Sequence, residues 1–353
     1  MPSARCIGSL RDAARRHGAW PVRSHEDTSA VHGPRPNALP SRSRRPDDGR
    51  RGLSVTAAIR ARLRTVASRV LPPGVKRRLK RLVRAYHQRF LAFTPADLQR
   101  ALWQLGVVPG DVLMVHSAFD SFLGFHGGPV DVIRALQDVV GPGGTLMMPT
   151  IPFQGTAVEY ALGEPVFDAR HTVSRMGLIT ELFRRAPGVV RSIHPTHSVA
   201  VWGSRADVIS AGHELADTPC GRLTPYARLL DYDGKILLAG VPANTMTFCY
   251  FVAEELEPRL AVPVLTRERY PMRWKDGDGT VRVSQLRLFS PRLDHDLHPL
   301  FSELKRRNQW SECSVGRLRL MLVRARDVYD AAAALADRGL FVRERTAEAP
   351  RGL

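Results

Sequence analysis

From residue 94 onward, short apolar runs alternate with amphipathic segments, and this alternation limits the possible folds more than any other feature. Apolar runs typical of buried strands are 111–117 (DVLMVHS), 145–150 (TLMMPT), 198–203 (SVAVWG) and 235–241 (KILLAGV). Segments with helical periodicity are 96–106, 129–140, 175–186, 205–215 and 244–255. Strands that are apolar on both faces need helices on both sides of their sheet, so the sequence predicts an α/β domain.

The C-terminal part continues this pattern. We expect a strand at 281–289, a helix at 298–308, a strand at 315–323 and a helix at 325–339. Sheets of this class bind ligands at the loops beyond their strand ends. The loops after 117 and after 241 are therefore candidate sites.

Composition fits a soluble globular protein, with 44% apolar and 24% charged residues in 353. No segment approaches the roughly 18 uninterrupted apolar residues of a spanning helix. The four cysteines lie far apart without a CxxC pair. This spacing argues against structural zinc and disulfide scaffolding, and it fits a reducing cytoplasm, so we expect a cytoplasmic protein.

The formal net charge of +18 comes almost entirely from the N-terminal extension. Residues 1–95 hold 22 basic and 5 acidic side chains, whereas the other 258 residues hold 30 basic and 29 acidic ones. A nucleic-acid-binding protein carries its basic footprint on the folded domain. The nearly neutral body therefore excludes nucleic acid as the expected partner.

The extension divides into two segments. Residues 1–54 are rich in Arg, Ser, Pro and Gly, which predicts a disordered tail; the same composition also fits an organellar transit peptide. Residues 55–93 form a basic amphipathic helical segment, with apolar residues spaced by three and four within 75–92. Such a helix either packs on the body or makes weak contact with an anionic membrane, and the sequence leaves both open.

Polar residues at the ends of two predicted strands are candidates for chemistry. His116 and Ser117 precede a loop that contains Gly124, Gly127 and Gly128. Backbone N–H groups there, next to a helix start, could hold phosphate or pantetheine amides; a satisfied loop histidine is the simpler alternative.

A second pair of histidines, His194 and His197, lies before the strand at 198–203. Metal binding is one interpretation, but no carboxylate or cysteine stands at zinc-site spacing. Pro195 between them favours a sharp turn instead. We therefore expect no metal site.

The helix at 244–255 (NTMTFCYFVAEE) ends in two carboxylates. Glu254 shares a helical face with Tyr250 and Phe251, whereas Glu255 points about 100° away. A carboxyl group on an apolar face is desolvated, which raises its pKa and suits it to proton transfer. We expect Glu254 to face a site and Glu255 to be a solvated helix charge.

Six ordered sequence blocks resemble the aminoglycoside 3-N-acetyltransferase family over about 95–334. The blocks are LGVVPGDVLMVHSAF, GGPVDVIRALQDVVGPGGTLMMPT, FDARHTVSRMGLITELFRRAPGVVRSIHPTHSVAVWG, TPYARLLDYDGKILLAGV, NTMTFCYFVAEE and VGRLRLMLV. The resemblance implies one αβα-layered domain with a central mixed sheet, spanning 94–345. This is not the common histone-type acetyltransferase fold, whose [QR]xxGx[GA] signature the body lacks.

The resemblance also implies site residues. His116, Ser117, Ala118 and Phe119 would line the channel for acetyl-CoA, the acetyl donor. Gly127 and Gly128 would close this channel, and Thr224 would stand near the acyl group.

In the family, a histidine of an NTxxHxxE-like motif takes the amine proton, and a glutamate orients it. Here Glu254 matches the glutamate, but Tyr250 or Phe251 stands in place of the histidine. Three alternatives follow: Glu254 is itself the base, or His116, His194 or His197 supplies the imidazole, or acetyl transfer is lost. Tyr250 is a poor base at neutral pH, but it can donate a hydrogen bond to an oxyanion.

The function implied is acetyl-CoA-dependent N-acetylation of an aminoglycoside or a related amino sugar, as in antibiotic resistance. The catalytic candidates are Glu254, Tyr250 and His194. Two other classes stay open: a non-catalytic relative that binds CoA or a sugar, and a membrane-surface accessory protein. The nearly neutral body shows no acidic excess for a polycationic acceptor, although Asp217, Asp231 and Asp233 could form a local cluster.

Overall fold

The structure is a computed structural model that describes residues 74, 75, 78, 86, 89–294 and 296–344. The chain divides into two units, Met1–Val70 and Leu71–Leu353, and all described residues belong to the second. The expected tail at 1–54 and most of the basic segment at 55–93 lie outside the described residues. Both interpretations of that segment therefore stay predictions.

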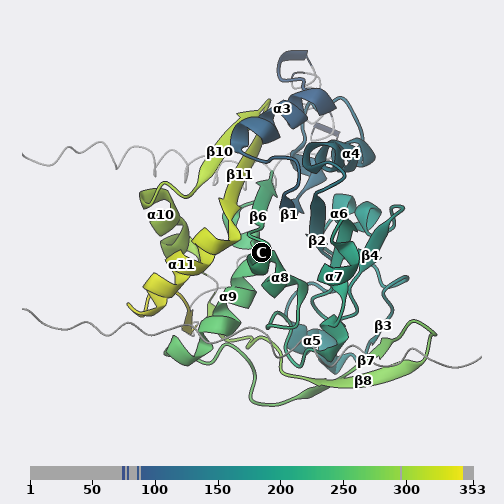
Figure 1. The fold of residues 1–353 in the computed structure, drawn as a ribbon, viewed down its shortest axis with the longest axis vertical. Coiled ribbons are helices and arrows are strands. Elements are labelled where there is room, and N and C mark those ends of the chain that lie inside the picture. The colour runs from purple at the N-terminus through teal and green to yellow at the C-terminus, as the bar shows by residue number, and fades with distance from the viewer. Residues whose placement is uncertain (1–73, 76–77, 79–85, 87–88, 295, 345–353) are drawn as a thin grey trace, which may run out of the picture. The chain divides into compact units, whose positions relative to one another are not determined.

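A seven-stranded mixed sheet forms the centre of the second unit, in the order β10-β11-β6-β1-β2-β5-β4 (Figure 1). Its strands along the chain are β1 (Val112–Ser117), β2 (Thr145–Pro149), β4 (Val189–Arg191), β5 (Val199–Gly203), β6 (Lys235–Ala239), β10 (Ser311–Val315) and β11 (Leu318–Arg324). The central strands β6, β1 and β2 are parallel to one another, and the pairings further out are antiparallel. The expected mixed sheet is confirmed.

Helices cover both faces of this sheet (Figure 1). One face packs on α3 (Pro95–Leu105), α4 (Pro129–Val140) and α6 (Leu178–Phe183). The other packs on α7 (Ala206–Ser210), α8 (Pro225–Asp231), α9 (Phe248–Leu256), α10 (His298–Arg306) and α11 (Ala325–Ala336). Neighbouring residues of β1 alternate between the two cores, with Met114 in one and Leu113 and Val115 in the other. This confirms the αβα layering.

A smaller sheet lies apart from the main one and has the order β3-β7-β8. Its strands are β3 (Val166–Phe167), β7 (Tyr270–Lys275) and β8 (Val281–Leu286), and α5 (Ala157–Leu162) packs beside β7. β9 (Leu293–Asp294) and β12 (Arg343–Glu344) form a separate pair. The strand expected at 281–289 is β8, which ends at Leu286 and belongs to this smaller sheet. Most of its residues are exposed, unlike those of the central strands of the main sheet.

Local signals explain where the elements begin and end. Thr94 caps α3 in a reciprocal capping box with Asp97, and the helix ends at Gly106 in the left-handed conformation, as expected. The helix expected at 244–255 is instead a 3-10 turn, η4 (Ala243–Thr245), followed by α9. The other short 3-10 turns are η2 (Phe119–Ser121), η3 (His213–Leu215) and η5 (Glu257–Arg259).

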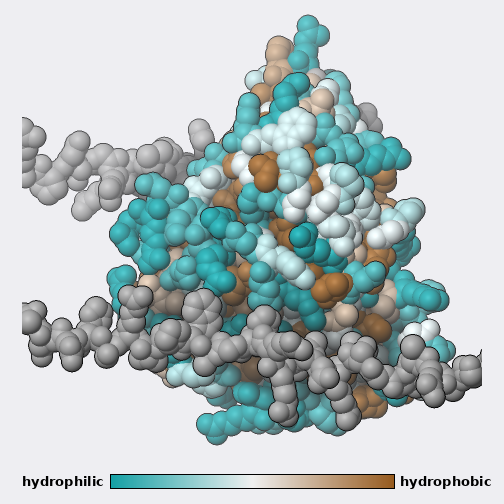
Figure 2. Space-filling view, in the orientation of Figure 1, coloured by the Kyte–Doolittle hydropathy of each residue, from teal (hydrophilic) through white to brown (hydrophobic). Residues whose placement is uncertain are grey.

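Among the helices that the structure describes, none is both long and apolar enough to cross a membrane. Figure 2 shows apolar residues on one face as small separate patches among polar ones. The large apolar side chains lie mainly in the two cores between sheet and helices.

Candidate active site

The chain direction brings several polar residues to one edge of the main sheet. β6, β1 and β2 are parallel, so their carboxyl ends meet there, and antiparallel β5 begins at the same edge because Val199 pairs with Pro149. Ser117 pairs with Ala239, and the amide of Thr150 donates to the carbonyl of Ser198 at 2.7 Å. The strand ends therefore carry the predicted His116–Ser117 and His194–His197 segments to neighbouring positions.

Glu254 lies on α9 and is partly buried. Its Oε1 accepts a hydrogen bond of 2.8 Å from the backbone amide of Cys220, and the Thr218 side chain also bonds to it. Burial raises the pKa of Glu254 to about 8, and these two hydrogen bonds oppose that rise. The inward orientation predicted for this carboxyl is present in the structure.

Glu255 differs from the expected solvated charge. Its side chain is only 12% exposed and forms an ion pair with Arg222. The loop before α8 therefore contacts both carboxylates at the end of α9, through Cys220 and Arg222. That loop is far away in sequence, so the helix alone gave no sign of it.

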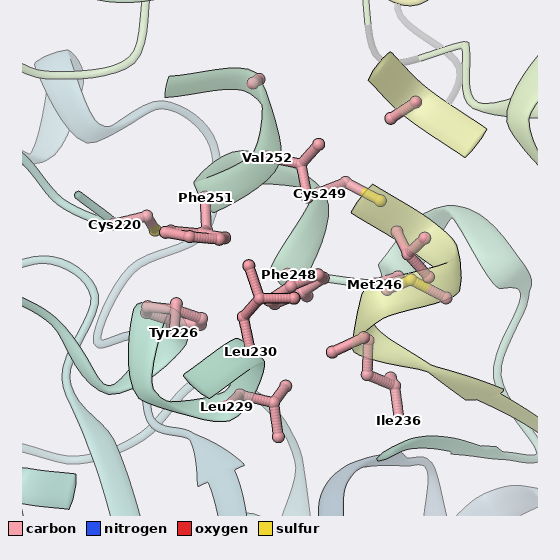
Figure 3. Packing of buried hydrophobic residues seen from close by; sticks show 14 of the residues in the cluster. Cys220, Tyr226, Leu229, Leu230, Ile236, Met246, Phe248, Cys249, Phe251 and Val252 are labelled. Carbon is pink, nitrogen blue, oxygen red and sulfur yellow. The ribbon is translucent and has the colours of Figure 1, made fainter. Parts of the chain in front are cut away.

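Tyr250 and Phe251 take different directions on α9. The Phe251 ring is fully buried and packs against the Phe248 ring, with 5.3 Å between the ring centroids. Both rings lie in the core between the main sheet and the helices α7 to α11 (Figure 3). The Tyr250 ring instead contacts Phe289 at 4.4 Å and His197 at 5.8 Å. Burial raises the pKa of Tyr250 to about 12, so its hydroxyl keeps its proton. Of the two residues that could replace the family histidine, Tyr250 lies beside an imidazole, that of His197, and Phe251 lies in the core.

His194 is buried, and its ring stacks on His213 with 4.4 Å between centroids. Its Nδ1 accepts from the amides of Thr196 and His197 at 3.3 and 3.1 Å. Nε2 therefore carries the ring proton, and it has no hydrogen-bond partner among the described residues. In this tautomer His194 offers a buried donor rather than a base.

His197 is the histidine whose ring contacts Tyr250. Its Nδ1 lies 3.0 Å from the Thr196 hydroxyl oxygen, and its ring also faces Phe153 and Phe289. Burial lowers the pKa of His197 to about 3, so the ring is neutral at physiological pH. When Nδ1 donates to Thr196, Nε2 is left as an acceptor.

His116 and Ser117 end β1 as predicted. His116 Nε2 and Ser117 Oγ are both buried, and neither has a partner in the part of the chain that the structure describes. Burial lowers the pKa of His116 to about 4. Two unsatisfied polar atoms at one strand end favour a ligand or ordered water there.

The glycine loop after β1 matches its expected role less well. The Gly128 amide already donates to Asp131 at 2.7 Å, as part of the cap of α4, so it is not free to hold a phosphate. Gly127 needs to be glycine because a Cβ would lie 2.8 Å from the Phe125 ring. Ala118 is half-buried, and Phe119 packs on Phe122 at 5.8 Å.

Thr224 caps the start of α8 and is fully buried. Its hydroxyl donates to the carbonyl of Gly221 at 2.7 Å, which fixes the turn that carries Cys220. Thr224 therefore positions the loop that holds Glu254.

Two residues of this site had no clear signal in the sequence. Cys220 is fully buried beside Tyr226 and Phe251 in the same cluster (Figure 3), and its amide holds Glu254. His213 sits in a segment predicted as ordinary helix, yet it stacks on His194 and lies 3.3 Å from the Pro219 carbonyl. Within the described residues, no three His, Cys, Asp or Glu side chains are arranged to hold a metal ion.

Comparison with known proteins identifies the family. The family model described as aminoglycoside 3-N-acetyltransferase matches residues 114–337. The chain belongs to this family. The match contains the last four residues of β1, all of α8 and α9, and the loops that carry Cys220 and His197.

Curated relatives share part of the chain. Aminoglycoside N(3)-acetyltransferase VII of Streptomyces paromomycinus is 36% identical over 173 residues, which are 44% of this chain and 59% of the relative. Aminoglycoside N(3)-acetyltransferase IV of Salmonella sp is 39% identical over 153 residues, which are 42% and 55% of the two chains. The chain thus spans slightly more than half the length of these relatives.

Solved structures share the fold over a longer stretch. Aminoglycoside acetyltransferase AAC(3)-IVa, as the apoenzyme, has a TM-score of 0.59 and 29% identity, covering 71% of this chain and 91% of its own. A mutant of that enzyme, solved with a gentamicin, has a TM-score of 0.60. AAC-IIIb, solved with CoASH, has a TM-score of 0.61 at 24% identity, covering 70% of this chain and 97% of its own.

Proposed function

We propose that the protein is an acetyl-CoA-dependent N-acetyltransferase whose acceptor is an amino group of an aminoglycoside or a related amino sugar. The observation that carries this proposal is the partly buried Glu254 carboxyl, with a pKa raised to about 8, held by Cys220 and Thr218 one helical turn from Tyr250. Family membership and the relative solved with a gentamicin support the same chemistry.

In this reaction the acceptor nitrogen attacks the thioester carbonyl carbon. The C–S bond breaks, the nitrogen loses one proton to the catalytic base, and the base passes this proton to the departing thiolate, so that CoA leaves as its thiol. The Glu254 carboxylate has a basicity close to that of an amine, so it suits the role of proton acceptor that the missing histidine would otherwise fill. The protonated Tyr250 hydroxyl suits the role of a donor to the oxyanion of the tetrahedral intermediate.

The other predicted residues take supporting roles in this proposal. His116 Nε2 and Ser117 Oγ would bind the acyl or pantetheine part of acetyl-CoA, since both are buried without partners in the described part of the chain. His194 would contribute as a donor its Nε2–H, which has no partner among the residues that the structure describes. His197 is the second candidate base, because its Nε2 is an acceptor when Nδ1 donates to Thr196. Its pKa of about 3 makes it a much weaker base than Glu254.

Release of thiol from acetyl-CoA tests the proposal. The full chain is assayed with gentamicin, other aminoglycosides and simple amino sugars, and the acetylated product is identified by mass spectrometry. We expect thiol release that depends on the acceptor. Binding of CoA without turnover of any amine would instead favour the non-catalytic alternative.

A further inference from the structure

A cavity of about 460 Å³ lies next to the aromatic residues of the candidate active site. It is lined by α5, the 262–270 segment and the 290–293 segment. Its wall is connected to the site, because Leu265 in the wall pairs with Phe289 across a β-bridge, and the Phe289 ring packs on Tyr250 at 4.4 Å. This volume falls within the range of about 300–1,000 Å³ that is usual for small-molecule sites.

The charged side chains that line this cavity without forming an ion pair to a described residue are mainly positive. Arg267, Arg292 and Glu268 line it, and the side chains of these three form no ion pair or hydrogen bond with any residue that the structure describes. Nearby arginines are neutralised: Arg269 pairs with Asp217 at 2.9 Å, and Arg287 lies 3.7 Å from Glu257. The unpaired charged groups that line the cavity are thus two guanidinium groups and one carboxylate.

Guanidinium groups bind phosphate and carboxylate groups through paired N–H donors in one plane. We propose that Arg267 and Arg292 bind an anionic group of the acceptor, so that the protein prefers amino sugars carrying a phosphate or a carboxylate over their neutral counterparts. This inference rests on the proposed function, since that function makes the neighbouring site an acceptor site.

Binding can be measured separately from turnover. Isothermal titration calorimetry of the full chain, saturated with CoA so that no acetyl group is transferred, compares glucosamine, glucosamine 6-phosphate and muramic acid. We expect at least one of the two anionic sugars to bind about tenfold more tightly than glucosamine. The phosphate and carboxylate arms show which anion the cavity accepts.

Variants assign the effect to the two arginines. The double variant Arg267→Ala/Arg292→Ala should lose the anionic preference while its dissociation constant for CoA stays unchanged. Arg326→Ala is the matched control, because Arg326 is exposed at the start of α11, beyond the opposite edge of the sheet. Equal binding of all three sugars, or a preference that persists in the double variant, would overturn the inference. Absence of acetyl transfer with intact anion binding would instead count against the proposed function alone.

Discussion

The backbone amide of Cys220 donates a 2.8 Å hydrogen bond to Oε1 of Glu254, joining the loop before α8 to the face of α9. The two residues are 34 positions apart, so the carboxyl is held by tertiary structure rather than by its own helix. A carboxyl that is held and partly desolvated in this way responds to changes in its neighbours.

Gly221→Ala should disturb Glu254 without unfolding the protein. A Cβ at Gly221 would lie 2.6 Å from the Thr218 hydroxyl and 3.2 Å from Glu254 Oε2. The Thr218 bond lowers the pKa of Glu254, so its loss should raise that pKa further and move the rising limb of the pH–rate profile to higher pH. Gly277→Ala is the control, since a Cβ there meets nothing within 4 Å. Identical pH profiles for both variants would contradict this arrangement.

Glu254 should also make stability depend on pH. Folding raises its pKa from 4.5 to about 8, so between these values the unfolded chain releases a proton that the folded protein retains. The free energy of unfolding therefore falls as pH rises from 4.5 to 8 and levels off above 8. Relative to the native protein, Glu254→Gln should gain stability over that window in urea titrations. A difference that stays constant from pH 5 to pH 8 would exclude a raised pKa.

The buried histidines predict the opposite dependence at low pH. Burial lowers the pKa of His213 and of His197 to about 3, so their contribution is complete above pH 6.5 and is lost as pH falls, when the unfolded chain takes up protons. Each histidine adds about 1.4 kcal/mol per pH unit to this slope. His213→Asn should reduce the slope between pH 6 and pH 4 by about one proton. Urea titrations at several pH values measure it, and an unchanged slope would mean that His213 is protonated in the folded state.

The sequence predicted the centre of the fold because its strands are buried on both faces. β1, β2 and β6 appear as apolar runs, and their ends could be placed within one or two residues. The antiparallel strand β10 and the strands β3 and β7 of the small sheet were missed, because half-exposed strands mix polar and apolar residues. The third strand of that sheet, β8, was expected, but as part of a longer strand at 281–289. α8 was also missed, although Thr224–Pro225 carries a clear helix-start signal.

The candidate site was predictable only where one helix or one strand carries its residues. Glu254 faces inward for the reason expected, its position relative to Tyr250 on α9. The contacts to Cys220 and the stacking of His194 on His213 join segments distant in sequence, so periodicity gave no access to them. The Arg222 ion pair, which makes Glu255 a buried partner, was missed for the same reason.

Tyr250→Phe should slow acetyl transfer without weakening acetyl-CoA binding. The Tyr250 hydroxyl keeps its proton because its pKa is about 12, and the ring is fixed against Phe289. Removing one donor to an oxyanion costs about 10²–10³ in kcat. Tyr232→Phe, at a half-exposed position, serves as the control. A Tyr250→Phe variant with normal kcat would assign the hydroxyl a purely structural role.

The pH dependence of kcat/KM for native protein and Glu254→Gln tests whether the Glu254 carboxylate accepts the acceptor's proton. Glutamine preserves the shape and the acceptor for the Cys220 amide but cannot take a proton, and Glu255→Gln controls for loss of a charge on the same helix. We predict a rising limb near pH 8 in the native protein and in Glu255→Gln. In Glu254→Gln we predict no such limb and a rate lower by about 10²–10⁴. A Glu254→Gln variant that keeps the native rate and the same rising limb would contradict the account.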